Sequence, residues 1–236
     1  MSPPTPVSIV MGGTSGVGLA TARLLASLGH RVIATGRTLT RVADLSVAGL
    51  TFSAVDARIA EAVGKFYRVT GPFQHLVIAL SGGKGAGPFA ALPLADLREG
   101  FDTKFFPQVQ VAQLALGTLH AGGSITFVSA VSARRPRPGL AGLASINGAI
   151  EAMVPALAQE LRPTRVNAVS PGVIDTPWWD WMAAADKAAA FQQYGAAAPV
   201  GRVGRPEEVA DAIRFLITNE FVTGSVIECD GGLRLS

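Results

Sequence analysis

The stretch Val7-Ser8-Ile9-Val10-Met11-Gly12-Gly13-Thr14-Ser15-Gly16-Val17-Gly18 decides the fold of this chain. Its first five residues have the composition of a short buried strand, and the segment Gly18–Leu28 has the period of a helix. Glycines between a strand and a helix let the main chain approach a pyrophosphate, whose charge the helix N-terminus attracts. A tight turn alone would also select glycine. Because strand, glycine turn and helix follow one another here, we predict a dinucleotide-binding turn.

Outward from this turn, short apolar runs alternate with segments of helical period, such as Gly18–Leu28 and Gly148–Leu161. The apolar runs are Val7–Met11, Arg31–Thr35, Leu50–Val55, His75–Leu80, Ser124–Ser129, Arg165–Ser170 and Ser225–Cys229. Such runs are typical of strands buried on both faces of a parallel sheet. With right-handed crossovers they predict an α/β fold, a Rossmann-like, doubly wound, mostly parallel seven-stranded sheet with helices on both faces. Ligands are then expected beyond the carboxyl ends of the strands.

Length and composition predict a single domain over residues 1–236, with 49% hydrophobic and 16% charged residues. The net charge is +3, but the basic residues are scattered and no basic run interleaves with aromatics, so we expect no nucleic-acid partner. Cys229 is the single cysteine, and the N-terminus lacks the regions of a signal peptide, which together predict a cytoplasmic location. Gly, Pro or charge breaks every apolar stretch before the ~18 residues of a spanning helix, so we expect no membrane span. No metal site is predicted.

The end of the second predicted strand bears on which nucleotide the turn would bind. An acidic residue there would accept a hydrogen bond from a ribose 2′-hydroxyl, but Gly36 holds that place and Arg37 follows. This favours a 2′-phosphate and therefore NADP(H) over NAD(H), although a surface arginine at a strand end is also common. Asp56, after the third strand, has two equal interpretations: an acceptor for the adenine amino group or a cap for the next helix.

These residues resemble the short-chain dehydrogenase/reductase family over nearly the whole chain. Gly12–Gly18 is similar to the family's TGxxxGxG turn, with Gly12 in place of the usual threonine. Further matches are Ala79–Gly82 at the family's Asn-Asn-Ala-Gly, Asn167–Gly172 at its sixth-strand signature, and Gly201–Ala210, Thr223-Gly224 and Asp230–Gly232 in its C-terminal segment. The resemblance implies a small-molecule substrate and a homodimer or homotetramer. It also implies nucleotide contacts from Gly12, Thr14, Ser15, Gly16, Val17, Gly18, Arg37, Asp56, Ala57, Leu80, Ser81, Gly82, Asn147, Pro171, Gly172, Val173 and Thr176.

The family's proton-transfer residues are replaced in this chain. The family uses a Tyr as acid and base, a Lys four residues later, a Ser that binds the substrate oxygen, and an Asn on a neighbouring helix. Those positions hold Leu143, Asn147, Ala130 and Lys104 respectively. No shift of the alignment produces Tyr-x-x-x-Lys, so we predict an atypical active site in which Ala130 and Leu143 are inert.

The Asn and Lys of the family are exchanged here, since Lys104 stands at the Asn position and Asn147 at the Lys position. Coincidence is the alternative, because lysine is common on helix surfaces. As a hypothesis, Lys104 hydrogen-bonds the nicotinamide ribose or donates a proton with a pKa lowered by burial. Ser132, reached by a short slip of the alignment, and Tyr194 complete the candidate catalytic residues.

The segment of about 176–199 corresponds to the family's substrate loop and carries Trp178, Trp179 and Trp181. These rings predict an apolar or aromatic ligand, although at least one of them is expected in the core or a subunit interface. Three hypotheses follow. The first is an NADP(H)-dependent oxidoreductase with unusual catalytic groups, which the intact turn favours. The second is a non-redox cyclase, isomerase or dehydratase, and the third is a catalytically silent binding or assembly protein.

Overall fold

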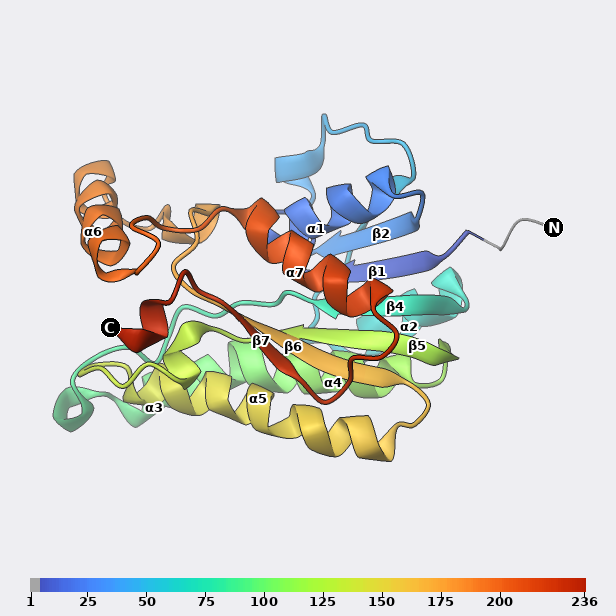
Figure 1. Cartoon of the computed structure of the whole chain (residues 1–236). Coiled ribbons are helices and arrows are strands. Elements are labelled where there is room, and N and C mark those ends of the chain that lie inside the picture. Colours follow the sequence, from blue (N-terminus) through green and yellow to red (C-terminus); the bar gives the residue numbers. More distant parts are fainter. Residues whose placement is uncertain (1–4) are drawn as a thin grey trace.

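The computed structural model describes residues 5–236, so most of the N-terminal segment considered for a signal peptide lies outside the described residues. A parallel sheet with the strand order β3-β2-β1-β4-β5-β6-β7 forms the centre of the molecule (Figure 1). Its strands are β1 (Val7–Met11), β2 (Arg31–Gly36), β3 (Leu50–Ala54), β4 (Phe73–Ile78), β5 (Leu119–Val128), β6 (Arg165–Pro171) and β7 (Val226–Cys229). The order reverses between β1 and β4, which creates the crevice where doubly wound sheets bind ligands. The predicted Rossmann-like fold is confirmed.

Helices cover both faces of this sheet (Figure 1). On one face lie α1 (Gly16–Ser27) and α7 (Pro206–Thr218), and on the other lie α2 (Ala60–Thr70), α4 (Phe106–Ala115) and α5 (Ala141–Glu160). Each face has its own apolar core: Leu25 and Ile213 belong to the first, Ile150 and Val154 to the second. The sheet is therefore buried on both sides, as its continuous apolar strands require.

Two element boundaries differ by more than two residues from the sequence prediction. Strand β5 begins at Leu119, not Ser124, because Leu119 already pairs with Phe73 on β4, before a register shift after which Ser124 pairs with His75. Helix α5 begins at Ala141, not Gly148, and Gly142 lets it pack against the main chain at Gly85. The longer α5 places both Leu143 and Asn147 on one continuous helix.

Helix α5 is long and apolar enough to cross a membrane by length and composition alone, with a mean hydropathy of 1.3, which the sequence prediction overlooked. In the fold it packs against the sheet, and Ile146, Ile150 and Val154 on one side of it are buried. The apolar composition of α5 is thus explained by its packing against the sheet in the core.

A π-helical turn, η3 (Phe101–Phe105), joins α3 (Leu94–Gly100) to α4. The N–H of Phe106 donates to the carbonyl oxygen of Phe101, five residues earlier, instead of four as in an α-helix. Pro107 follows and has no N–H to donate to this turn. Such turns are frequent at functional sites, and this one carries Lys104.

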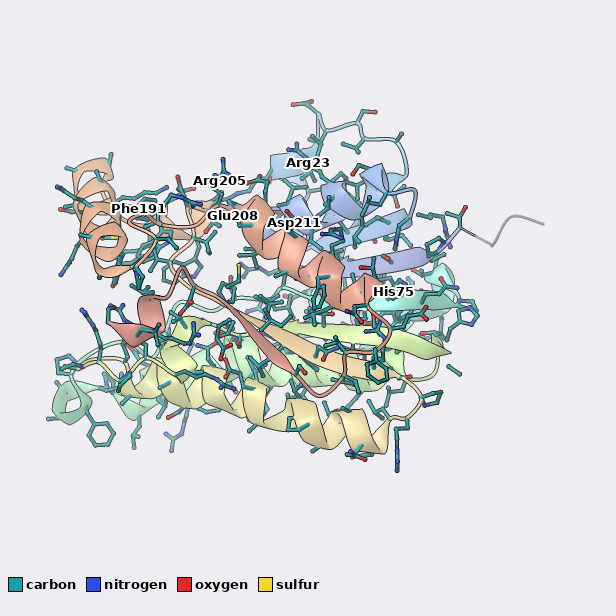
Figure 2. The ribbon with its side chains drawn as sticks, viewed as in Figure 1. Arg23, His75, Phe191, Arg205, Glu208 and Asp211 are labelled. Carbon is teal, nitrogen blue, oxygen red and sulfur yellow. The ribbon has the colours of Figure 1, made fainter. Side chains whose placement is uncertain are left out.

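Helix α6 (Ala184–Ala197) lies apart from the two helix layers, at the same end of the molecule as the C-terminus (Figure 1). A short turn, Pro177–Trp179, precedes it. Figure 2 shows Phe191 on this helix, and the indole ring of Trp179 packs edge-on against Phe191 with centroids 5.6 Å apart. The segment of about 176–199 is therefore largely helical.

Candidate functional site

A cavity of about 670 Å³ opens beyond the carboxyl ends of the central strands. The glycine turn after β1 and the loops after β2, β4, β5 and β6 contribute to its lining. It continues to the first turns of α5 and to the tryptophan turn before α6. All residues for which the sequence predicts nucleotide contacts, from Gly12 to Thr176, line this cavity.

The glycine turn fits a group that must approach the main chain closely. Gly12 has a φ of +83°, and a Cβ on it would lie 2.6 Å from the carbonyl oxygen of Ala79. A Cβ on Gly18 would collide with the carbonyl oxygen of Gly12. The turn thus packs closely against the start of α1. The first residues of α1 line the cavity, and the free N–H groups of a helix N-terminus favour a negatively charged group such as a pyrophosphate.

Three arginines lie in the lining beyond β2 and β3: Arg37, Arg41 and Arg58. Asp56 is the acidic residue among them, and Arg58 binds it through two side-chain nitrogens, with the shorter contact at 2.6 Å. The Arg58 hydrogen bonds hold the pKa of the Asp56 carboxyl at about 2. Asp56 is therefore a paired carboxylate that accepts from Arg58 and not the N-cap of α2, which is Ile59.

Lys104 and Ser129 meet at the opposite part of the lining. The Nζ of Lys104 donates to the main-chain carbonyl oxygen of Ser129 at 3.1 Å, next to Ala130. Burial lowers the pKa of the Lys104 amine to about 8, although the negative charge of Glu151 acts in the other direction. Two N–H bonds of the ammonium are left for other partners.

Asn147 lies in the same lining and is almost completely buried, at 3% exposed. Its amide nitrogen donates to Ser132 Oγ at 3.0 Å and to the carbonyl oxygen of Leu143 at 2.9 Å. Its Oδ1 atom is buried and has no hydrogen-bond partner within residues 5–236. A buried acceptor without a partner is costly, and a ligand hydroxyl at this place would satisfy it.

Ala130 and Leu143 form an apolar part of the lining beside Lys104 and Asn147. Neither side chain can donate a hydrogen bond, so the ammonium of Lys104 is the strong donor on this side of the cavity. Lys84, on the loop after β4, is a further cation in the lining and pairs with Asp96 at 3.4 Å.

Two of the candidate catalytic residues do not line the cavity. Ser132 lies beside Asn147 and is buried. Tyr194 is on α6, where its ring lies 5.8 Å from the guanidinium of Arg135 and packs against Trp179. The structure thus brings Lys104 and Asn147 together in the lining, with Ser132 one hydrogen bond further away.

The tryptophans divide between the cavity and the surface. Trp178 and Trp179 line the cavity, whereas Trp181 is 70% exposed. The indole N–H of Trp178 donates to the carbonyl oxygen of Gly82 at 3.2 Å, and that of Trp179 to Ile174 at 3.0 Å. The first bond links the segment after β6 to the loop after β4.

The sequence reasoning missed Arg41, Arg58, Lys84 and Glu151. Arg58 follows Asp56 by two residues, a spacing at which a basic side chain reaches an acidic one, so it could have been found. Glu151 stands four residues after Asn147 on α5 and therefore lies on the same side of the helix. This spacing could have indicated that Glu151 lies near the cavity.

Comparison with known proteins agrees with this geometry. The family model described as "Enoyl-(Acyl carrier protein) reductase" matches residues 12–234. The chain is 31% identical over 250 residues to the granaticin polyketide synthase putative ketoacyl reductase 2 of Streptomyces violaceoruber, covering 99% of this chain and 98% of that protein. It is 30% identical over 246 residues to the short-chain dehydrogenase/reductase ATR9 of Stachybotrys chlorohalonatus, covering 95% of each.

Among solved structures, a small-chain dehydrogenase in complex with NADPH superimposes with a TM-score of 0.89 and 34% identity, covering 99% of this chain and 100% of that chain. Both the sequence match and the fold extend over essentially the whole molecule. The chain belongs to the short-chain dehydrogenase/reductase family of oxidoreductases.

Proposed function

We propose that this protein is an NADP(H)-dependent oxidoreductase that acts on a small apolar or aromatic molecule and uses Lys104 in place of the family's Tyr and Lys. The observation that carries the proposal is the position of the Lys104 amine, which lies in the cavity lining 3.1 Å from the Ser129 carbonyl, beside Ala130 and Leu143.

The residues present fit a phosphorylated dinucleotide. The glycine turn has no room for a Cβ at Gly12 or Gly18, and Asn147 Oδ1 is a buried acceptor that a ribose hydroxyl would satisfy. Arg37, Arg41 and Arg58 offer the charge for a 2′-phosphate, and NADPH is the ligand of the similar small-chain dehydrogenase. When bound, the cofactor supplies or accepts a hydride.

Lys104 is the group that would move the proton. In the reducing direction the acceptor gains a hydride and a proton, and the proton leaves Lys104 Nζ, which becomes a neutral amine until solvent reprotonates it. A general acid works best with a pKa near the working pH, and burial brings the pKa of Lys104 to about 8. The remaining N–H bonds of the ammonium and the free Oδ1 of Asn147 would orient the nicotinamide ribose.

The apolar wall and the indole rings support the substrate class. Ala130 and Leu143 cannot bind a hydroxyl or carbonyl oxygen, whereas Trp178 and Trp179 offer aromatic faces and edges. Activated double bonds in apolar or aromatic molecules, such as C=N or conjugated C=C, therefore fit this site better than simple ketones.

Titration with NADPH and NADH, followed by fluorescence and calorimetry, tests the proposal. We expect NADPH to bind more tightly than NADH, and Lys104→Ala to lose NADPH affinity or hydride transfer. Lys65→Ala is the matched control, because Lys65 is exposed on α2 and outside the lining. Absence of binding by either nucleotide overturns the proposal, and tight binding without hydride transfer to any of a panel of activated double bonds favours a non-redox or silent protein.

A further inference from the structure

Glu151 is a buried carboxylate behind the cavity lining, and the proposed reaction leaves it without a role. It lies on α5 and is 7% exposed. Ser129 Oγ donates to its Oε1 at 2.8 Å, and Arg134 Nε donates to its Oε2 at 2.7 Å. Burying a carboxylate costs free energy even when it is hydrogen-bonded, so its presence next to an apolar core calls for a reason.

Ser129 links this carboxylate to Lys104. The main-chain carbonyl oxygen of Ser129 accepts from Lys104 Nζ, while the hydroxyl of the same residue donates to Glu151. The ammonium of Lys104 and the carboxylate of Glu151 therefore both form a hydrogen bond with Ser129, which directly follows β5. The negative charge of Glu151 raises the pKa of the Lys104 amine against the lowering effect of burial.

Arg134 moderates that charge from the other side. Its Nε binds Glu151, and its Nη1 lies 3.3 Å from Glu228 on β7, with the side chain half exposed to solvent. The guanidinium thus shares its charge between a buried and a partly exposed carboxylate. Two further charged groups belong to the surroundings of Lys104. Lys84, on the loop after β4, lines the same cavity and pairs with Asp96, and Asp102 is exposed on the same turn as Lys104.

We propose that Glu151 is the counter-charge that keeps Lys104 protonated, and that Arg134 sets how strongly it does so. Glu151 is a positioning residue in this arrangement, since it acts on the reacting groups only through Lys104 and Ser129. The inferred role of the protonated amine rests on the proposed function, but the coupling between Glu151 and Lys104 does not.

The coupling can be measured on the protein without nucleotide. The chain has only the lysines Lys65, Lys84, Lys104 and Lys187, so the acylation rate of each amine by acetic anhydride can be followed by mass spectrometry as a function of pH. Only the neutral amine reacts, so the midpoint of each profile gives that lysine's pKa. Lys65 is exposed and serves as the internal reference.

Two substitutions are expected to shift the Lys104 profile in opposite directions. Glu151→Gln keeps the side-chain shape and an acceptor for Ser129 but removes the charge, so the midpoint should fall by about one pH unit. Arg134→Met removes a neighbouring cation and frees the Glu151 charge, so the midpoint should rise. Glu151→Asp should keep the midpoint above that of Glu151→Gln, and Glu160→Gln, exposed at the end of the same helix, should change nothing.

An unchanged Lys104 midpoint in both Glu151→Gln and Arg134→Met overturns the inference, as does a shift of the same sign in both. If Glu151→Gln does not fold, Arg134→Met still tests the inference, because the Arg134 side chain is half exposed and its loss should not prevent folding. Only a rise in the Lys104 midpoint in this variant supports the coupling. Failure of the proposed function has a different signature: nucleotide binding is then missing in the unsubstituted protein while the opposite shifts of Lys104 remain.

Discussion

The indole N–H of Trp178 donates to the main-chain carbonyl oxygen of Gly82, a residue 96 positions earlier in the chain. This bond joins the loop after β4 to the tryptophan turn over the cavity. Thr176, two residues before Trp178, also lies against Gly16. A Cβ atom on Gly16 would be 3.2 Å from the Cβ atom of Thr176. The tryptophan turn therefore contacts two other walls of the cavity.

Removing this bond should speed the release of nucleotide. Trp178→Phe keeps an aromatic ring but has no N–H, and the loss of one hydrogen bond of about 1 kcal/mol corresponds to about a fivefold faster release. Stopped-flow fluorescence of bound NADPH measures this rate. Trp181→Phe, in the same segment but exposed, should leave it unchanged, and equal effects of the two substitutions would contradict the role of the bond.

Arg37→Ala should lower the affinity for NADPH roughly 10- to 100-fold, the range expected for a lost hydrogen bond to a charged group. The affinity for NADH should change little, because NADH lacks the 2′-phosphate. Calorimetric titration of Arg37→Ala and of the unsubstituted protein with both nucleotides measures these changes in affinity. Arg23→Ala is the control, since Arg23 lies on α1 outside the lining (Figure 2), and a parallel loss for both nucleotides in Arg37→Ala would contradict a phosphate contact.

Restoring the family's residues should restore carbonyl reduction only when the exchange of Lys and Asn is also reversed. Ala130→Ser, Leu143→Tyr and Asn147→Lys together would place a second amine near that of Lys104 in the cavity, because Lys104 remains. Adding Lys104→Asn removes the second cation, and the fourfold variant should gain NADPH-dependent reduction of an aromatic aldehyde. General acid catalysis contributes about 10²- to 10⁴-fold, which sets the expected gain over the unsubstituted protein. A fourfold variant that binds NADPH but reduces nothing would indicate a pocket reshaped for other chemistry.

Glu208 should contribute stability that disappears in acid. Its carboxylate accepts from the main-chain N–H of Arg205 at 2.8 Å and from the guanidinium of Arg202, at the first turn of α7 (Figure 2). The Arg202 hydrogen bonds hold its pKa at about 2, below the ordinary value of 4.5. The stabilisation is therefore present above pH 4.5 and is lost as the pH falls toward 2.

Thermal unfolding between pH 7 and pH 2.5 measures this contribution. Glu208→Gln should lower the free energy of unfolding at pH 7 by about 1 kcal/mol or less, since the ion pair is partly exposed, and by clearly less at pH 2.5, close to the pKa of about 2. Glu207→Gln, on the same helical turn and exposed, should have no pH-dependent effect. A loss in Glu208→Gln that persists undiminished at pH 2.5 would rule out the ionic origin.

The fold and the part of the cavity lined by the glycine turn could be predicted from the sequence because both depend on local patterns. The apolar runs mark the strands, and the glycines from Gly12 to Gly18 mark a turn whose packing excludes side chains. The start of β5 at Leu119 could not be predicted, because it depends on the pairing of Leu119 with Phe73 on β4 across a register shift.

The catalytic half was harder to predict, because its contacts join distant segments. The alignment placed Lys104 and Asn147 in the same region, and both line the cavity. The sequence did not show that Lys104 would bind the carbonyl of Ser129, or that Ser129 would also bind Glu151, because these contacts span 25 and 22 residues. The pKa of Lys104 depends on those contacts and on burial, so only its direction could be predicted.

The π-helical turn at Phe101–Phe105 makes the spacing between α3 and α4 functionally fixed. The turn holds one residue more than an α-turn, so the same residues wound as a regular α-helix would rotate all that follows by about 100°. Gln108, which ties α4 to the ends of β4 and β5 through Leu80 and Val128, would then face away from the sheet. Homologues with a lysine at the position of Lys104 should therefore tolerate varied side chains around that lysine but keep the number of residues in the Phe101–Phe105 turn constant.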